Sequence, residues 1–189
     1  MQGKIRIIAG DYRGRRLAVA DLPGLRPTPD RVRETLFNWL GQWLPGLSCL
    51  DLFAGTGALG FEAASRGAAR VVMVEQAKHA FTSLEKAKRD LRAARIELIF
   101  GDALDYLARA DERFDVVFLD PPFGQNALPA VLARLPRVLA PRARVYVEAP
   151  RALAHPEGFA ILRQARAGQV HFQLLERRFD DQGGLSGNV

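Results

Sequence analysis

The residues best suited to chemistry in this chain surround a glycine-rich turn. The segment from 48 to 60 reads SCLDLFAGTGALG. Its apolar residues predict a buried strand, and the glycines at 55, 57 and 60 allow a sharp turn into a helix. Backbone N–H groups in such a turn can approach a ligand at the carboxyl end of the strand. We therefore expect a ligand site at this turn.

The type of ligand follows from the charge beside the turn. The three glycines fit G-x-G-x-x-G, a spacing typical of dinucleotide-binding folds, and Glu75 stands where a ribose-binding acid is expected. Asp51 argues against a dinucleotide, because its carboxylate would repel a diphosphate and attract a cation. S-adenosylmethionine has a sulfonium, an ammonium and one carboxylate, so its net charge is positive. We predict S-adenosylmethionine as the cofactor, with a dinucleotide or a purely structural turn as the alternatives.

Acidic residues also follow the other strands that the sequence predicts. Asp51, Glu75, Asp102 and Asp120 come at the ends of the first four strands of the main sheet, and in a doubly wound sheet such ends face one crevice. We expect Glu75 to bind the ribose hydroxyls, Asp102 the adenine amino group and Asp51 the methionine part. The complete predicted cofactor site is Asp51, Phe53, Ala54, Gly55, Gly57, Glu75, Gln76, Asp102, Ala103 and Asp120.

The most specific chemical signal is the segment Asp120, Pro121, Pro122 and Phe123, which we predict to be catalytic. It resembles the (Asp/Asn/Ser)-Pro-Pro-(Tyr/Phe) motif of methyltransferases that act on planar exocyclic nitrogens. Such an amine donates its lone pair into the ring and is a poor nucleophile. Hydrogen bonds from the amine to Asp120 and to a backbone carbonyl would localise that lone pair, and Phe123 would stack on the base. The alternative is a strand stopped by proline, with Phe123 packed inward.

The charge of the chain points to an anionic partner. The 189 residues carry a formal net charge of +6, and a basic enzyme more often meets a polyanion than a neutral metabolite. A base inside a helix must be unpaired or flipped out to reach the acceptor site, so basic residues must hold the backbone around it. A solvated basic face is the alternative. The predicted nucleic-acid contacts are Lys4, Arg6, Arg13, Arg15, Arg16, Arg26, Arg31 and Arg33.

Short apolar segments that alternate with amphipathic ones predict an α/β fold with a mostly parallel sheet covered on both faces. The segments 160–164 and 170–178 have no crossover helix between them, which predicts an antiparallel pair at one sheet edge. The remaining strands are expected at 48–52, 70–75, 96–100, 114–120 and 144–148, and the helices at 57–66, 77–93, 103–108 and 128–139.

The amino-terminal part should form two further units. Residues 4–8 and 15–19 predict a small basic hairpin, and a helix should run to about residue 42 with Thr28 as its N-cap. We divide the chain into a hairpin extension (1–20), a proline-rich arm and helix that cap the site (21–46), a catalytic domain (47–179) and a frayed tail (180–189).

Composition limits the other classes of site. A single cysteine excludes an internal disulfide, and three scattered histidines show no metal-ligand spacing, so we expect no metal. The chain has no apolar run of transmembrane length and no secretory segment at its start. We expect a cytoplasmic monomer with no membrane partner.

The order of the motifs is similar to that of the RsmD family, which methylates the exocyclic N2 of a guanine in bacterial small-subunit (16S) ribosomal RNA. The resemblance implies S-adenosylmethionine as donor, a seven-stranded Rossmann-like sheet of the class I methyltransferase type, and an assembled or partly assembled 30S particle as substrate. The segments that carry it are 6–10, 13–15, 24–28, 30–34, 36–38, 51–60, 120–123 and 168–170.

Other functions remain open at this point. An amino-methyltransferase acting on DNA, on another RNA or on a protein glutamine amide would use the same chemistry, although the basic charge disfavours a protein substrate. A noncatalytic RNA-binding ribosome-assembly factor would keep the fold, but the presence of Asp120 and Glu75 argues against it. An NAD-dependent oxidoreductase is the remaining alternative.

Overall fold

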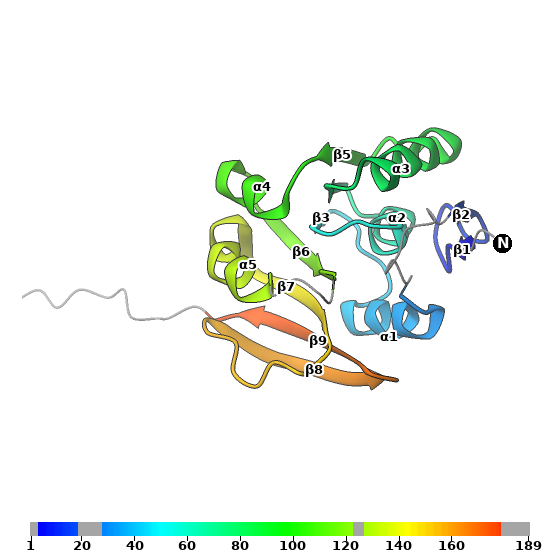
Figure 1. Ribbon diagram of the computed structural model, residues 1–189. Coiled ribbons are helices and arrows are strands. Elements are labelled where there is room, and N and C mark those ends of the chain that lie inside the picture. Colours follow the sequence, from blue (N-terminus) through cyan, green and yellow to red (C-terminus); the bar gives the residue numbers. More distant parts are fainter. Residues whose placement is uncertain (1–3, 19–27, 123–126, 179–189) are drawn as a thin grey trace, which may run out of the picture.

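A seven-stranded sheet forms the centre of the computed structural model, which describes residues 4–18, 28–122 and 127–178 (Figure 1). The strand order is β5-β4-β3-β6-β7-β9-β8. Strands β3 to β7 are parallel, whereas β9 is antiparallel to both β7 and β8. This confirms the predicted sheet and its antiparallel edge pair. The strands are β3 (Ser48–Asp51), β4 (Arg70–Glu75), β5 (Ile96–Phe100), β6 (Phe114–Leu119), β7 (Leu139–Ala149), β8 (Phe159–Ala167) and β9 (Val170–Arg177).

Helices cover both faces of the sheet, as the apolar strands require. In β6, Val116 and Phe118 join the core cluster on the side of α1, α2 and α3, while Val117 and Leu119 join the cluster on the side of α4 and α5. None of the helices in the described part of the chain is long and apolar enough to cross a membrane. The helices are α1 (Asp30–Leu40), α2 (Ala58–Ser65), α3 (Lys78–Leu91), α4 (Ala103–Arg109) and α5 (Leu128–Arg134).

The largest difference from the predicted elements lies between α5 and β7. A single helix was expected over 128–139, but α5 ends at Arg134 and a 3-10 turn, η1 (Leu135–Val138), follows it. Pro136 explains the change, because proline has no N–H to continue an α-helix. Strand β7 then begins at Leu139, ahead of the expected residue 144, and its pairing with β6 shifts register before Val116.

The chain reverses direction across the sheet between β3 and β6. It leaves β3 for β4 and β5 on one side and returns to pair β6 with the other side of β3. At such a switch point the loops after the two strands separate and leave a crevice where ligands of α/β proteins bind. The turn after Asp51 and the segment from Asp120 therefore flank one place in the fold.

The predicted basic hairpin is present as a separate two-stranded antiparallel sheet of β1 (Lys4–Arg6) and β2 (Arg16–Ala18). It lies outside α2 (Figure 1). Glu62 of α2, which has 0% of its surface exposed, attaches the hairpin to the rest of the protein. The Glu62 carboxylate accepts hydrogen bonds from the backbone N–H of Ile8 (2.8 Å) and of Ala9 (3.1 Å). One acid thus joins the loop of the hairpin to the core.

The same carboxylate also binds two arginines, and this overturns one prediction. Arg33 of α1 donates to Glu62 Oε2 (3.3 Å), and Arg66 donates to Glu62 Oε1 (2.8 Å). Arg33 was predicted to contact nucleic acid, but its side chain is 0% exposed and also donates to Asp30 (2.6 Å). A guanidinium buried in this way is retained by its partners and cannot reach a phosphate. The prediction for Arg33 is wrong.

Glu62→Gln should destabilise the fold, because the change keeps the size of the side chain but leaves Arg33 and Arg66 without the anion between them. We expect the free energy of unfolding in a denaturant titration to fall by about 3–5 kcal/mol. Glu97→Gln is the control, because Glu97 pairs with Arg70 at the surface and should matter by less than about 1 kcal/mol. A loss at Glu62 no larger than that at Glu97 would contradict this account of how the hairpin is attached.

Candidate functional site

The turn after β3 needs its glycines for two different reasons. Gly55 and Gly57 have positive φ angles of 50° and 80°, which side chains disfavour. Gly57 directly precedes α2. Gly60 lies inside α2, where a Cβ atom would come within 2.7 Å of the Met73 sulfur on β4. The first two glycines shape the turn, and the third lets the helix approach the sheet.

The N–H groups of these glycines bind within the protein. Gly55 donates to Glu75 Oε2 (2.7 Å), Gly57 to the carbonyl of Ala54 (2.7 Å), and Gly60 to Asp51 Oδ2 (2.9 Å). These three N–H groups are therefore used within the protein, and contact between other N–H groups of the turn and a ligand stays a prediction. A dinucleotide would need the glycine N–H groups for its pyrophosphate, and here an acid of the protein already occupies one donor at the start of α2.

Asp51 is the acid buried most deeply at the turn, with 2% of its surface exposed. Burial raises its pKa to about 7, and the negative charge of Glu75 adds to the rise, while hydrogen bonds from the backbone of Gly60 and Phe53 oppose it. A buried carboxylate of this kind is stabilised by a nearby cation. The surroundings of Asp51 thus suit a positively charged ligand such as S-adenosylmethionine.

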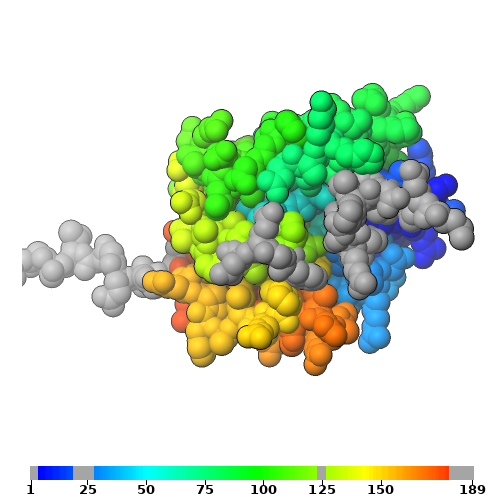
Figure 2. Space-filling view, in the orientation of Figure 1, coloured from blue at the N-terminus to red at the C-terminus, as the bar shows by residue number. Residues whose placement is uncertain are grey.

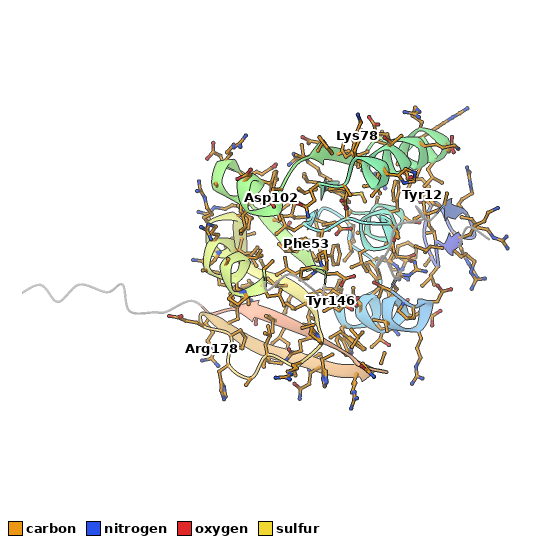
Figure 3. All side chains as sticks on the ribbon, in the orientation of Figure 1. Tyr12, Phe53, Lys78, Asp102, Tyr146 and Arg178 are labelled. Atoms are coloured by element: carbon orange, nitrogen blue, oxygen red, sulfur yellow. The ribbon has the colours of Figure 1, made fainter. Side chains whose placement is uncertain are left out.

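Glu75 and Asp102 hold the neighbouring loops. Glu75 Oε1 accepts from the N–H of Ala77 (2.6 Å), so its carboxylate ties the end of β4 to the glycine turn. Asp102 is the N-cap of α4, and its Oδ1 accepts from the N–H of Leu104 (2.7 Å) and of Asp105 (3.1 Å). Figure 3 shows Asp102 at the start of that helix. Their contacts with ribose and adenine stay predictions.

The other predicted cofactor residues line the same edge of the sheet. Phe53 is partly buried and lies near the centre of the view in Figure 3. Ala54 and Ala103 are buried, and Gln76 is exposed. These positions are compatible with contact to a ligand beside the turn, and the contacts themselves stay predictions.

Asp120 follows β6 and lies at one end of a series of contacts with three buried residues, none of which was predicted for this site. Thr28 Oγ1 lies 3.5 Å from Asp120 Oδ2 and 3.1 Å from Glu148 Oε1. The hydroxyl of Tyr146 donates to the same Glu148 oxygen (2.9 Å). Thr28 is 7% exposed and Glu148 is 4% exposed. Two acids and two hydroxyls thus form one buried cluster at the end of β6 and β7.

The prediction that Thr28 is an N-cap is wrong, and Glu148 is a site residue that was not predicted. Thr28 is not the N-cap of α1, because Pro29 takes that position without a side-chain hydrogen bond. The Thr28 hydroxyl faces the acids instead. Glu148 could have been found by the rule that selected the four other acids, since it stands at the carboxyl end of the fifth parallel strand.

Burial disfavours the ionised forms of both acids in this cluster. Burial raises the pKa of Asp120 well above its ordinary value, the charges of Glu148 and Asp51 raise it further, and the Thr28 hydroxyl opposes the rise. Burial also raises the pKa of Glu148, against the hydrogen bonds from Tyr146 and Thr28. Acids placed this close favour a bound cation or a retained proton. The edge of the sheet therefore suits a cation beside Asp51 and a hydrogen-bond donor beside Asp120.

The remainder of the predicted catalytic segment is only partly described. Pro121 is buried and Pro122 is exposed. Phe123 lies outside the described residues, so its stacking on a base stays a prediction, and Arg26 lies outside them as well.

The other predicted nucleic-acid contacts are exposed. Figure 2 shows the hairpin, in dark blue, and α1, in lighter blue, on the same side of the molecule. Two of the cations also bind the protein: Arg15 donates to the carbonyl of Asp90 (3.1 Å), and Arg6 lies 3.9 Å from Asp30. The exposed residues of the set are Lys4, Arg6, Arg13, Arg15, Arg16 and Arg31.

Comparison of the sequence with known proteins found a matching family and similar proteins. Residues 5–176 match the model of the family described as conserved hypothetical protein 95. Ribosomal RNA small subunit methyltransferase D of Escherichia coli (strain K12) is 42% identical over 180 residues, which are 93% of this chain and 91% of that protein.

Comparison with solved structures found proteins of the same fold. The structure of yhhF from Escherichia coli superposes with a TM-score of 0.84 at 42% identity, over 93% of this chain and 98% of that one. Precorrin-6y C5,15-methyltransferase of Geobacter metallireducens shares the fold alone, with a TM-score of 0.68 at 15% identity over 86% of this chain and 94% of that one.

Asp51→Asn should remove a pH dependence of stability. The pKa of Asp51 is raised from 3.8 to about 7 on folding, so the folded protein binds more protons between these values and loses stability as pH rises through that window. Asparagine has no such penalty. The free energy of unfolding of the variant minus that of wild type should therefore increase by roughly 2–4 kcal/mol between pH 4 and pH 8.

Denaturant unfolding at the two pH values measures this difference. Asp105→Asn, at an exposed position of α4, is the control and should show no comparable change between them. If the difference between Asp51→Asn and wild type were the same at both pH values, the charge of buried Asp51 would not oppose folding.

Proposed function

Because the chain belongs to the family of ribosomal RNA small subunit methyltransferase D, we propose that it methylates the exocyclic N2 amine of a guanine in small-subunit (16S) ribosomal RNA. As a member it is a methyltransferase that uses S-adenosylmethionine. The single observation that supports an amine as acceptor is the place of Asp120, which follows β6 at the switch point beside Asp51.

The residues of the glycine turn fit this donor. When bound, S-adenosylmethionine supplies an electrophilic methyl group on a positively charged sulfonium. Asp51 provides a buried negative charge beside the turn, and Glu75 provides a carboxylate at the end of β4. We assign Asp51 to the cationic methionine part and Glu75 to the ribose hydroxyls, with Asp102 and its neighbours beside the adenine.

Asp120 acts on the acceptor amine. Its carboxylate accepts a hydrogen bond from one N–H of the planar amine, and a backbone carbonyl of the Pro121 and Pro122 segment accepts a hydrogen bond from the other N–H. These hydrogen bonds turn the lone pair out of the ring and direct it to the methyl group, and they grow stronger as charge develops on nitrogen. Prolines suit this segment because they hold the backbone and add no competing N–H.

The partner is positioned by charge. We assign the exposed cations of the hairpin and α1 to the RNA backbone around a base that is unpaired or flipped out. A 30S particle, assembled in part or in full, is the proposed substrate, and the cytoplasm is the proposed location. We also propose that the protein acts as a monomer.

Asp120→Ala should lower methyl transfer to the 30S particle by about a hundredfold or more, because the amine loses the group that orients it. Binding of S-adenosylhomocysteine, measured by calorimetry, should stay within about tenfold, since Asp120 acts on the acceptor. Asp105→Ala on α4 is the control for surface acids. Turnover of Asp120→Ala comparable to that of wild type would exclude this role for Asp120, and transfer to DNA in preference to 30S would exclude the proposed substrate.

Replacing Arg13, Arg15 and Arg16 by glutamine should weaken binding to small-subunit RNA and flatten its salt dependence, because fewer counterions are released on binding. Affinity for S-adenosylhomocysteine should not change. Arg109 and Arg134, on α4 and α5, provide a control pair away from the hairpin. If the salt slope of the hairpin variant equalled that of wild type, the hairpin would be a solvated surface without RNA contacts.

A further inference from the structure

The hydroxyl of Thr28 lies between partly buried Asp120 and buried Glu148, and it can donate to only one of them. Thr28 Oγ1 is 3.1 Å from Glu148 Oε1 and 3.5 Å from Asp120 Oδ2. A threonine hydroxyl has one hydrogen to donate. If both acids were ionised, that hydrogen would serve Glu148 at the shorter distance, and the contact with Asp120 would bring two oxygens together with no hydrogen between them.

A single proton on Asp120 removes this conflict. Protonated Asp120 can donate to Thr28 Oγ1, Thr28 then donates to Glu148 Oε1, and Tyr146 donates to the same Glu148 oxygen (2.9 Å). Each of the three contacts, Asp120 with Thr28, Thr28 with Glu148 and Tyr146 with Glu148, then has one hydrogen between its two oxygens. The Glu148 carboxylate receives two hydrogen bonds, which favours its ionised form.

The surroundings of the pair support the same distribution of charge. Asp51 from β3 and Glu148 from β7 both act on Asp120 as negative charges and raise its pKa. Tyr146 and Thr28 are the groups that act on Glu148, and both lower its pKa against the effect of burial. The proton therefore belongs on Asp120, and the charge belongs on Glu148.

We propose that Glu148 is a positioning residue for the acceptor site: with Asp120 and the bridging Thr28 it forms an acid pair that holds one proton, and its charge determines when Asp120 is ionised. This rests on the proposed function in one respect, namely that ionised Asp120 accepts the N–H of the amine. Glu148 itself touches neither the methyl donor nor the amine in this proposal. Its effect reaches the reaction through the protonation of Asp120.

A near-isosteric variant of Glu148 tests the pair. Glu148→Gln removes a negative charge beside Asp120, so Asp120 ionises more easily and its titration moves to lower pH. A purely structural role for Glu148 would not produce this shift.

The experiment has one readout without turnover and one with it. Carbon-13 NMR of the carboxyl groups in the ligand-free protein follows the titration of Asp120 directly, and the acid limb of kcat for methyl transfer to the 30S particle reports the same group during catalysis. For Glu148→Gln, the ratio of kcat at pH 6 to kcat at pH 8 should rise severalfold above the wild-type ratio.

A matched control is available elsewhere in the chain. Glu112 also accepts a hydrogen bond from a tyrosine, Tyr106 (2.8 Å), but its charged partner is Arg70. Glu112→Gln should leave the titration of Asp120 and the pH profile unchanged.

The two readouts separate the failure of this proposal from that of the proposed function. An unchanged Asp120 titration in the NMR spectra of Glu148→Gln would overturn the acid pair, even if methyl transfer were normal. A shift to higher pH in this variant would also overturn it. The expected shift in a protein that methylates no 30S particle would support the pair and refute the proposed function.

Discussion

The hydrogen bond from the Gly60 N–H to the buried Asp51 carboxylate is the contact around which the site is built. It joins the end of β3 to the first turn of α2 over 2.9 Å and places a negative charge where the positive end of a helix dipole would otherwise attract an anion. A glycine turn with this spacing is often used for phosphate. We propose that Asp51 disfavours phosphate here and makes the same turn suitable for a cation. In this proposal the fold is shared with other α/β enzymes, whereas Asp51 distinguishes the ligand.

A second buried carboxylate positions the amino-terminal part. Glu62 binds the backbone of the hairpin loop and the guanidinium groups of Arg33 and Arg66. The helix α1 that carries Arg33 also packs on the sheet, where Trp39 stacks on Phe172 at a centroid distance of 5.3 Å. Thr28, two residues before α1, contacts the acids of the acceptor site. Helix α1 and the residue Thr28 that precedes it therefore join the acid that holds the hairpin to the acceptor site.

The sequence predicted the parts of the structure that depend on repeated local patterns. Apolar runs located the strands, and the absence of a crossover helix near Gly168 located the antiparallel edge. The end of α5 at Pro136 was a local signal that was missed, whereas the other errors concern residues whose role depends on distant partners. Thr28 has the residue type and place of an N-cap, and Arg33 lies on a helix rich in charge, so only the packing of α1 on α2 and β7 revealed where their side chains go. The internal acceptors of the Gly55 and Gly60 N–H groups could not be predicted for the same reason, because the side chains of Glu75 and Asp51 reach them from other elements.

We propose that this chain places a methyl group on the N2 amine of a guanine in small-subunit ribosomal RNA. Mass mapping of the nucleosides of that RNA, from cells with and without the protein, is the decisive measurement. We expect one N2-methylguanine to be missing in the cells without the protein and to return when the wild-type chain is supplied. An unchanged N2-methylguanine content, with or without the protein, would exclude this activity.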